Sequence, residues 1–77
     1  METTTIKLKD EFIKLGQALK AAGLADTGSD AKAAILDGKV RVNGEVCLQR
    51  GKKLYGGDDV VFRQQRIRIE APAPADE

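Results

Sequence analysis

Apolar and polar residues alternate at the start of the chain and then take up a helical spacing. Within residues 5–9, Ile6 and Leu8 stand between polar neighbours, which predicts a short, half-exposed strand. After Asp10, apolar residues recur every three to four positions, at Phe12, Leu15, Leu19 and Ala22. This spacing predicts an amphipathic helix that has Asp10 as its N-cap and ends before Gly23.

A second, shorter helix is predicted over residues 30–37. Ser29 can accept a hydrogen bond from the first turn as the N-cap, and Asp30 suits the positive end of the helix dipole. Three apolar residues share one face of this helix: Ala31, Ala34 and Ile35. Gly38 supplies the left-handed residue that commonly follows a helix, so both ends are marked.

The remainder of the chain has the period of β-strands. Residues 39–42 and 45–48 flank Asn43-Gly44, a pair typical of a two-residue hairpin turn. A strict two-residue turn would set Val42 opposite Glu45 and so mix apolar and polar residues on one face. We therefore expect a bulge or a longer loop at this hairpin.

Two more strands are predicted near the C-terminus, over residues 59–63 and 66–70. A turn at Gln64-Gln65 would join them, and Gly56-Gly57-Asp58 is turn chemistry that precedes them. The order of elements predicts an α+β fold. In this fold a two-helix motif packs on a small, twisted, mostly antiparallel sheet of three to five short strands.

The size of the chain fits one domain. With 77 residues, of which 42% are apolar, there is material for a single small core. We assign residues 1–70 to this domain. The segment 71–77 contains two prolines and two acidic residues, and it is expected to be a disordered tail because it has little to bury.

Residue usage excludes several kinds of site. The chain has no His and a single Cys, Cys47, which excludes an internal disulfide, a zinc site and Ser-His-Asp or Cys-His catalysis. Cys47 stands between Val46 and Leu48 and is expected to be a packing residue. We expect no metal, no cofactor and no enzymatic activity.

Neither a targeting segment nor a membrane span is predicted. The chain opens Met-Glu-Thr-Thr-Thr, without the basic start and apolar stretch of a signal peptide. No apolar run approaches the length that a bilayer requires. A reduced, cytoplasmic compartment is therefore expected, with no membrane partner.

Positive charge is concentrated in the second half of the chain. The whole sequence has 13 Lys and Arg against 12 Asp and Glu, yet residues 32–68 contain nine basic and four acidic residues, a net charge of +5. The densest cluster is Arg50-Gly51-Lys52-Lys53, where the glycine lets the backbone approach a phosphate. A solvated loop is the other interpretation of this cluster.

The segment from Ser29 to Gly44 carries a recognisable motif. It reads Ser-Asp-Ala-Lys-Ala-Ala-Ile-Leu-Asp-Gly-Lys-Val-Arg-Val-Asn-Gly, and Gly57-Asp58 follows before an apolar strand. This pattern, over roughly residues 11 to 63, resembles the RNA-binding domain named after ribosomal small-subunit protein four. Because the chain is little longer than the match, it looks like a standalone bacterial member, a group associated with ribosomal or other structured RNA.

The resemblance implies non-catalytic RNA binding, with the two helices and the adjoining strand turn facing the RNA. The basic residue of the second helix, the residues at the strand entry and two polar positions carry over from the family. Charge alone adds the basic loop, because Lys and Arg bind phosphates by displacing counterions. The candidate RNA-binding residues are Ser29, Lys32, Lys39, Arg41, Asn43, Arg50, Lys52 and Lys53.

Several of these residues also have structural interpretations. Ser29 suits an N-cap, Asn43 suits a turn that needs positive φ, and Lys32 could be a solvated helix residue. Many family members begin the first helix with Arg-Leu-Asp, whereas Asp10 and Glu11 stand here, so the part of residues 9–12 in binding is left open. The expected partner is structured RNA, with ribosomal RNA favoured, bound by a monomer.

Other functions are weighed against RNA-backbone binding. Base stacking is disfavoured because Phe12 and Phe62 are expected in the core, which leaves Tyr55 alone. A DNA-binding helix-turn-helix is disfavoured because the second helix exposes residues poorly suited to reading base edges. A protein-binding adaptor that docks on a ribosomal or RNA-modifying protein stays as the alternative, and salt dependence would separate it from RNA binding.

Overall fold

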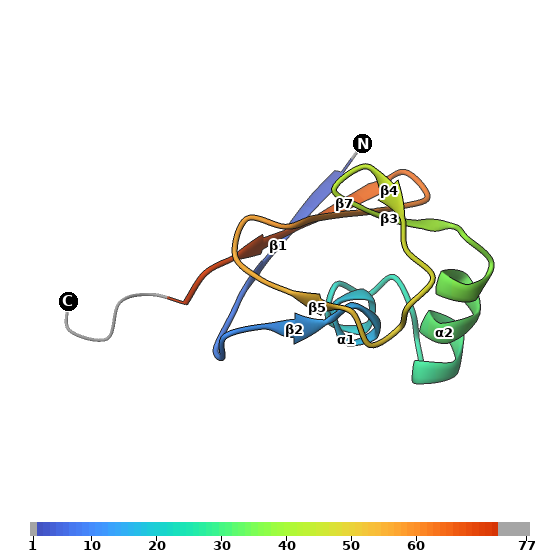
Figure 1. Ribbon diagram of the computed structural model, residues 1–77, viewed down its shortest axis with the longest axis horizontal. Coiled ribbons are helices and arrows are strands. Elements are labelled where there is room, and N and C mark those ends of the chain that lie inside the picture. The colour runs from blue at the N-terminus through green and yellow to red at the C-terminus, as the bar shows by residue number, and fades with distance from the viewer. Residues whose placement is uncertain (1, 73–77) are drawn as a thin grey trace.

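The computed structural model describes residues 2–72. Its main sheet has five strands in the order β1-β7-β6-β3-β4 (Figure 1). They are β1 (Glu2–Lys7), β7 (Gln65–Glu70), β6 (Asp59–Phe62), β3 (Val40–Val42) and β4 (Glu45–Val46). β1 runs parallel to β7, and the other neighbouring pairs are antiparallel. A separate antiparallel ribbon joins β2 (Ile13–Lys14) to β5 (Lys53–Leu54).

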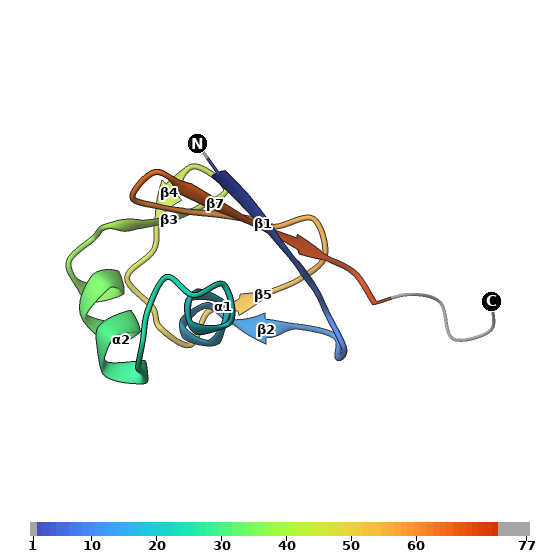
Figure 2. The same cartoon turned by 180° about the vertical axis from the view of Figure 1, so that it is seen from behind.

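Two helices, α1 (Leu15–Ala21) and α2 (Gly28–Leu36), pack against one another on one side of the sheet (Figures 1 and 2). Between the two layers lies an aliphatic core, whose largest fully buried side chains are Leu15, Leu19, Ile35, Val40, Leu54, Val60, Ile67 and Ile69. Cys47 is half-buried against this core, as expected of a packing residue.

The predicted α+β fold is confirmed. Of the tail predicted at 71–77, residues 73–77 lie outside the described residues.

The first helix starts later than the sequence pattern predicts. Residues 13–14 pair with residues 53–54, so α1 begins at Leu15 with Lys14 as its N-cap. Asp10 lies in a bend before this ribbon, and the prediction that it caps the helix is wrong. The competing interaction is a strand pairing between distant segments, which local periodicity does not reveal.

The first strand is displaced in the opposite direction. It spans Glu2–Lys7 instead of residues 5–9, and all six of its residues pair in parallel with β7. Leu8 follows the strand and is buried, and its N–H donates to the Glu70 carbonyl at 3.0 Å. Pairing with the last strand of the domain therefore sets the start of β1, rather than the short alternation in its own sequence.

α2 is capped by Thr27 and not by Ser29, so that prediction is also wrong. The Thr27 hydroxyl accepts a hydrogen bond from the Asp30 backbone N–H at 3.1 Å. Thr27 has extended backbone, as a cap requires, whereas Ser29 lies inside the first helical turn. The end of the helix agrees with the prediction, because Gly38 follows it with a φ of 74°.

The hairpin between β3 and β4 has a strict two-residue turn, so the predicted bulge or longer loop is wrong. Val42 pairs directly with Glu45. Asn43 and Gly44 have φ values of 54° and 86°, the signs that a type I′ turn needs. The mixed pairing is tolerated because β4 is an edge strand in which Glu45 and Val46 are both exposed.

The turn between β6 and β7 lies one residue earlier than predicted, at Arg63 and Gln64. The predicted turn would have set Arg63 opposite Arg66, and like charges directly opposite one another are unfavourable. The observed register instead sets Asp59 opposite Arg68. A carboxylate oxygen of Asp59 lies 4.0 Å from Arg68 Nε, so the register exchanges a repulsion for an attraction.

Candidate nucleic-acid interface

The basic loop, residues 50–53, closes over the start of α1. The Leu15 N–H donates to the Lys52 carbonyl at 2.9 Å, and the Gly16 N–H donates to the Arg50 carbonyl at 3.1 Å. These are N–H groups that have no partner within the helix itself. A Cβ added at Gly16 would stand 3.0 Å from Arg50 Cγ, so the glycine allows the loop to come this close.

A groove lies between this loop, α1 and the first residue of α2. We call it the basic groove and define it by Lys14, Gln17, Lys20, Gly28 and Arg50. Three of these residues are cations, and among the described residues that line the groove none is acidic. Lys14, Gln17 and Lys20 follow one another at intervals of three, so they lie along one side of α1. The groove therefore offers several cations to one anionic ligand.

Lys14 and Lys20 are missing from the residues predicted from the sequence. That prediction set Asp10 and Glu11 at the start of the first helix, which left the part of this segment in binding open. In the structure both acids precede β2, Lys14 is the exposed N-cap of α1, and Lys20 lies on the exposed side of the helix. The available signal was the spacing of Lys14 and Lys20 beside the buried residues of the same helix.

Two candidate residues of α2 lie close to the groove. Lys32 follows Gly28 by four residues, so the two share a face of the helix, and Gly28 lines the groove. Ser29 is in the same first turn as Gly28. Both Lys32 and Ser29 are exposed. The fold thus brings α1, the start of α2 and the loop to one side of the molecule.

Lys52 and Lys53 extend the positive charge beyond Arg50. Lys53 lies opposite Lys14 in the β2–β5 ribbon, and its amine is 4.8 Å from the centre of the Phe12 ring. Both loop lysines are exposed. The ribbon therefore carries cations next to the basic groove.

Lys39 stands in different surroundings. Its amine is 4.0 Å from the Asp37 carboxylate. It lines a second groove together with Asp26, Asp30, Asp37 and Arg63. Three aspartates face two basic residues there, so this part of the surface is not a strong attractor of phosphate.

Arg41 lies on the face of the sheet that is turned away from the helices. Its neighbours in β3, Val40 and Val42, are buried, and side chains alternate along a strand, so Arg41 is directed outward. It pairs with Val61, which in turn pairs with Arg66. The structure therefore separates Arg41 from the basic groove by the thickness of the sheet.

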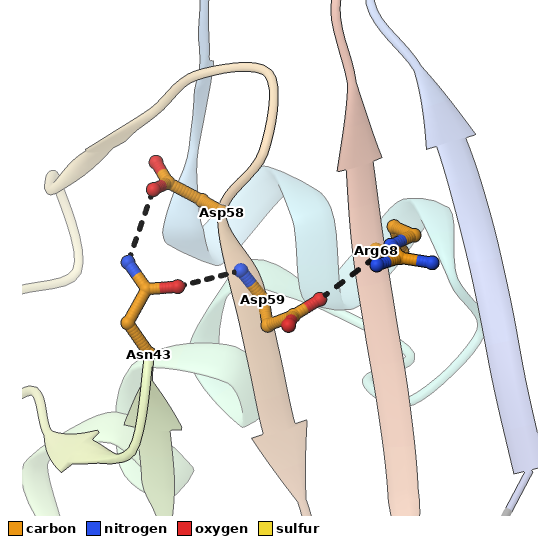
Figure 3. Close-up of polar contacts among 4 residues, drawn as sticks. All are labelled: Asn43, Asp58, Asp59 and Arg68. Atoms are coloured by element: carbon orange, nitrogen blue, oxygen red, sulfur yellow. Dashed lines mark hydrogen bonds and ion pairs between the residues drawn. The ribbon is translucent and has the colours of Figure 1, made fainter.

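The Asn43 side chain is engaged within the protein (Figure 3). Its amide nitrogen donates to Asp58 Oδ1 at 3.0 Å, and its amide oxygen accepts from the Asp59 N–H at 2.9 Å. The β3–β4 turn is thereby tied to the start of β6. These two bonds give Asn43 a structural role that the sequence motif does not reveal.

Within residues 2–72, no group of three or more His, Cys, Asp or Glu side chains is placed to hold a metal ion. Over the same part of the chain, no helix combines the length and the apolar character that crossing a bilayer demands.

Comparison with known families assigns the fold. The model of the S4 domain matches residues 6–70, which include every predicted site residue. The chain belongs to the S4 domain family. The resemblance that the motif at residues 29–44 carries is therefore confirmed, and the match extends beyond it to β1 and β7.

This S4 domain has relatives in two well-known bacteria. It is 44% identical over 55 residues to RlbA of Bacillus subtilis (strain 168), named a probable ribosome maturation protein, a match that covers 71% of this chain and 78% of RlbA. It is 32% identical over 63 residues to YbcJ of Escherichia coli (strain K12), which covers 82% of this chain and 90% of YbcJ.

A solved structure shares the architecture of this S4 domain. The solution structure of YbcJ from E. coli, described as revealing an αL motif involved in RNA-binding, has a TM-score of 0.66 and 31% sequence identity to this chain. The similarity covers 92% of this chain and 89% of the YbcJ chain. The two-helix motif on a mixed sheet is thus a property of both proteins.

Proposed function

We propose that this protein binds structured RNA through the basic groove, without catalysing a reaction. The observation that carries the proposal is the meeting of Lys14, Lys20 and Arg50 beside the start of α2, with no acidic residue among the described residues that line the groove. The cations come from a helix and from a loop that is hydrogen-bonded to that helix. They are therefore held at fixed spacing, as recognition of a folded RNA backbone requires.

The proposed contact set differs from the one expected from the sequence. Lys32, Ser29, Lys52 and Lys53 flank the basic groove and are kept. Lys39 and Arg41 are left out because one faces aspartates and the other lies on the far side of the sheet. Asn43 is left out because its amide is engaged with Asp58 and Asp59.

Ribosomal RNA is the ligand class that we favour. RlbA, the relative that is 44% identical, is named for ribosome maturation, and the αL motif of YbcJ is described as involved in RNA-binding. The proposal includes a cytoplasmic location, because ribosomal RNA is assembled into bacterial ribosomal subunits in the cytoplasm. It also includes a monomer, because one chain supplies the whole groove.

The proposal is tested by binding a labelled, structured ribosomal RNA fragment over a salt series. Two variants with the same change in net charge are compared with the natural protein: K14E/K20E/R50E in the groove and K39E/R41E/R66E outside it. The groove variant is expected to lose at least about tenfold in affinity and to lower the salt slope by about two to three, since each phosphate contact contributes about 0.7–0.9. The outer variant is expected to lose much less.

Three results would contradict the proposal. Equal losses in the two variants would mean that net charge matters and the groove does not. An unchanged groove variant would place the contacts elsewhere. Binding that is indifferent to salt, or no binding by the natural protein at low salt, would favour the protein-binding adaptor instead.

A further inference from the structure

An aromatic pair lies at the end of the β2–β5 ribbon. The ring centres of Phe12 and Tyr55 are 6.1 Å apart, with the ring planes inclined at 53°. This arrangement corrects the expectation that Phe12 is a core residue of the first helix, because Phe12 precedes β2 and is only half-buried. Tyr55 has 48% of its surface exposed. Two aromatic rings, and not one, are therefore available at this surface.

The backbone that carries the exposed ring is held on both sides. The Tyr55 N–H donates to Asp58 Oδ2 at 2.7 Å, and the Tyr55 carbonyl accepts from the Asp58 N–H at 3.1 Å. The other oxygen of the same carboxylate accepts from Asn43. Because this turn is tied to a second turn, little backbone freedom would be lost when a ligand contacts the ring.

Cations lie close to the Phe12 side of the aromatic pair. The Lys53 amine is 4.8 Å from the centre of the Phe12 ring, and Lys14 lies opposite Lys53 in the ribbon. Phe12 also lines a groove between β1 and α1 that contains Lys7, Lys9 and Lys20 and one acid, Asp10. Lys20 belongs to the basic groove as well. A chain of cations thus connects the basic groove with the aromatic pair.

We infer that Phe12, Tyr55 and Lys53 form a stacking site for one unpaired base of the bound RNA. The inference rests on the proposed function and specifies its ligand, a structured RNA with an unpaired nucleotide next to the part held in the basic groove. The base lies against the exposed Tyr55 ring, Phe12 packs against that ring at a tilt, and Lys53 contacts the phosphate beside the base. RNA bases stack on exposed aromatic rings with little sequence preference. In such sites, basic side chains contact the phosphates of the RNA backbone.

Tyr55 provides a direct signal for the test, because the chain has no other Tyr and no Trp. Two labelled RNAs are used, a ribosomal hairpin with one bulged nucleotide and the same hairpin without it. The bulged hairpin is expected to quench the tyrosine emission over the concentration range in which it binds. The hairpin without the bulge is expected to bind at least about fivefold more weakly and to quench less.

Two variants of Tyr55 separate stacking from simple burial. Y55F keeps the ring and is expected to bind the bulged hairpin as the natural protein does. Y55L keeps apolar bulk without a ring, and it is expected to lose at least about fivefold in affinity for the bulged hairpin with an unchanged salt slope, because no phosphate contact is removed. K53Q is expected to lower the slope by about one.

The failures of the two proposals are distinguishable. If Y55L binds both hairpins as the natural protein does while K14E/K20E/R50E has lost binding, the stacking site is wrong and the basic groove stands. Equal affinity of the natural protein for both hairpins, without quenching, also overturns the stacking site. If the natural protein binds neither hairpin at low salt, both proposals fail.

Discussion

Asn43 and Asp58 are joined side chain to side chain across fifteen residues, with the Asn43 amide nitrogen 3.0 Å from Asp58 Oδ1 (Figure 3). The same Asn43 side chain accepts from the Asp59 N–H at 2.9 Å, and Asp58 accepts from the Tyr55 N–H at 2.7 Å. The Asn-Gly and Gly-Asp parts of the sequence motif are therefore two halves of one contact. This contact holds the β3–β4 turn against the turn that leads into β6.

Replacing Asn43 with Gly is expected to lower the free energy of unfolding by about 1–2 kcal/mol. Glycine keeps the positive φ of 54° at this position, so the loss reports the two side-chain hydrogen bonds, each of which contributes about 0.5–1.5 kcal/mol. Urea denaturation measures the change. The folded variant is expected to bind RNA as the natural protein does, and a fully stable variant with weakened RNA binding would reverse the assignment of Asn43 to structure.

The N-cap of α2 is tested by a substitution at Thr27, with a matched control at Ser29, two residues further along the chain. T27A removes the hydroxyl that accepts from the Asp30 N–H at 3.1 Å, and it is expected to cost about 1 kcal/mol of stability. S29A removes a hydroxyl from the first turn and is expected to change stability by less than about 0.5 kcal/mol. Thermal or urea unfolding of the two variants distinguishes the caps, and a larger loss in S29A would restore the cap predicted from sequence.

Substitution of Gly56 is expected to destabilise the fold, because this glycine has the least space around it for a Cβ atom. A Cβ there would lie 2.6 Å from the Ala71 Cβ and 2.7 Å from the Ala71 backbone nitrogen. G56A is expected to destabilise the domain by about 1–3 kcal/mol, because the backbone after β7 must move. The control is G51A, whose Cβ would meet nothing within 4 Å and which is expected to be near neutral. Equal effects of the two substitutions on the urea midpoint would argue against the close contact at Ala71.

Elements fixed by local patterns were predictable from the sequence. The end of α2 at Gly38, the alternation in β3 and the position of the turn at Asn43-Gly44 depend on residues within a few positions of one another. The length of that turn was not predicted, because the strict two-residue register sets Val42 opposite Glu45. The motif in the same segment sufficed for the family, which the match over residues 6–70 confirms. Local chemistry failed where the chain offered two suitable residues, as with Thr27 and Ser29.

Elements fixed by distant pairing were not predictable. The β2–β5 ribbon joins residues about forty positions apart, and it moves the N-cap of α1 from the predicted Asp10 to Lys14. The same ribbon brings Lys14 together with Lys20 and Arg50 in the basic groove, and it places Phe12 next to Tyr55 instead of in the expected core.

The candidate site shows the same limit. Charge alone indicated the loop at residues 50–53, which the structure sets beside α1. The family resemblance indicated Lys39 and Arg41, but only the fold shows that Lys39 lies among aspartates and that Arg41 lies on the outer face of the sheet. The sequence gives the charge of each side chain, but the fold determines which charged residues lie next to it.

RNA binding through the basic groove is tested most directly by an NMR titration of the isotope-labelled 8.3 kDa chain with a structured ribosomal RNA fragment, read as backbone amide shifts. We expect the largest shifts in residues 14–20, 28–32 and 50–53, smaller shifts as salt is raised, and little change in residues 39–42 and 66–68. Shifts centred on the outer sheet residues, or none at any salt concentration, would show that the basic groove is not the binding site.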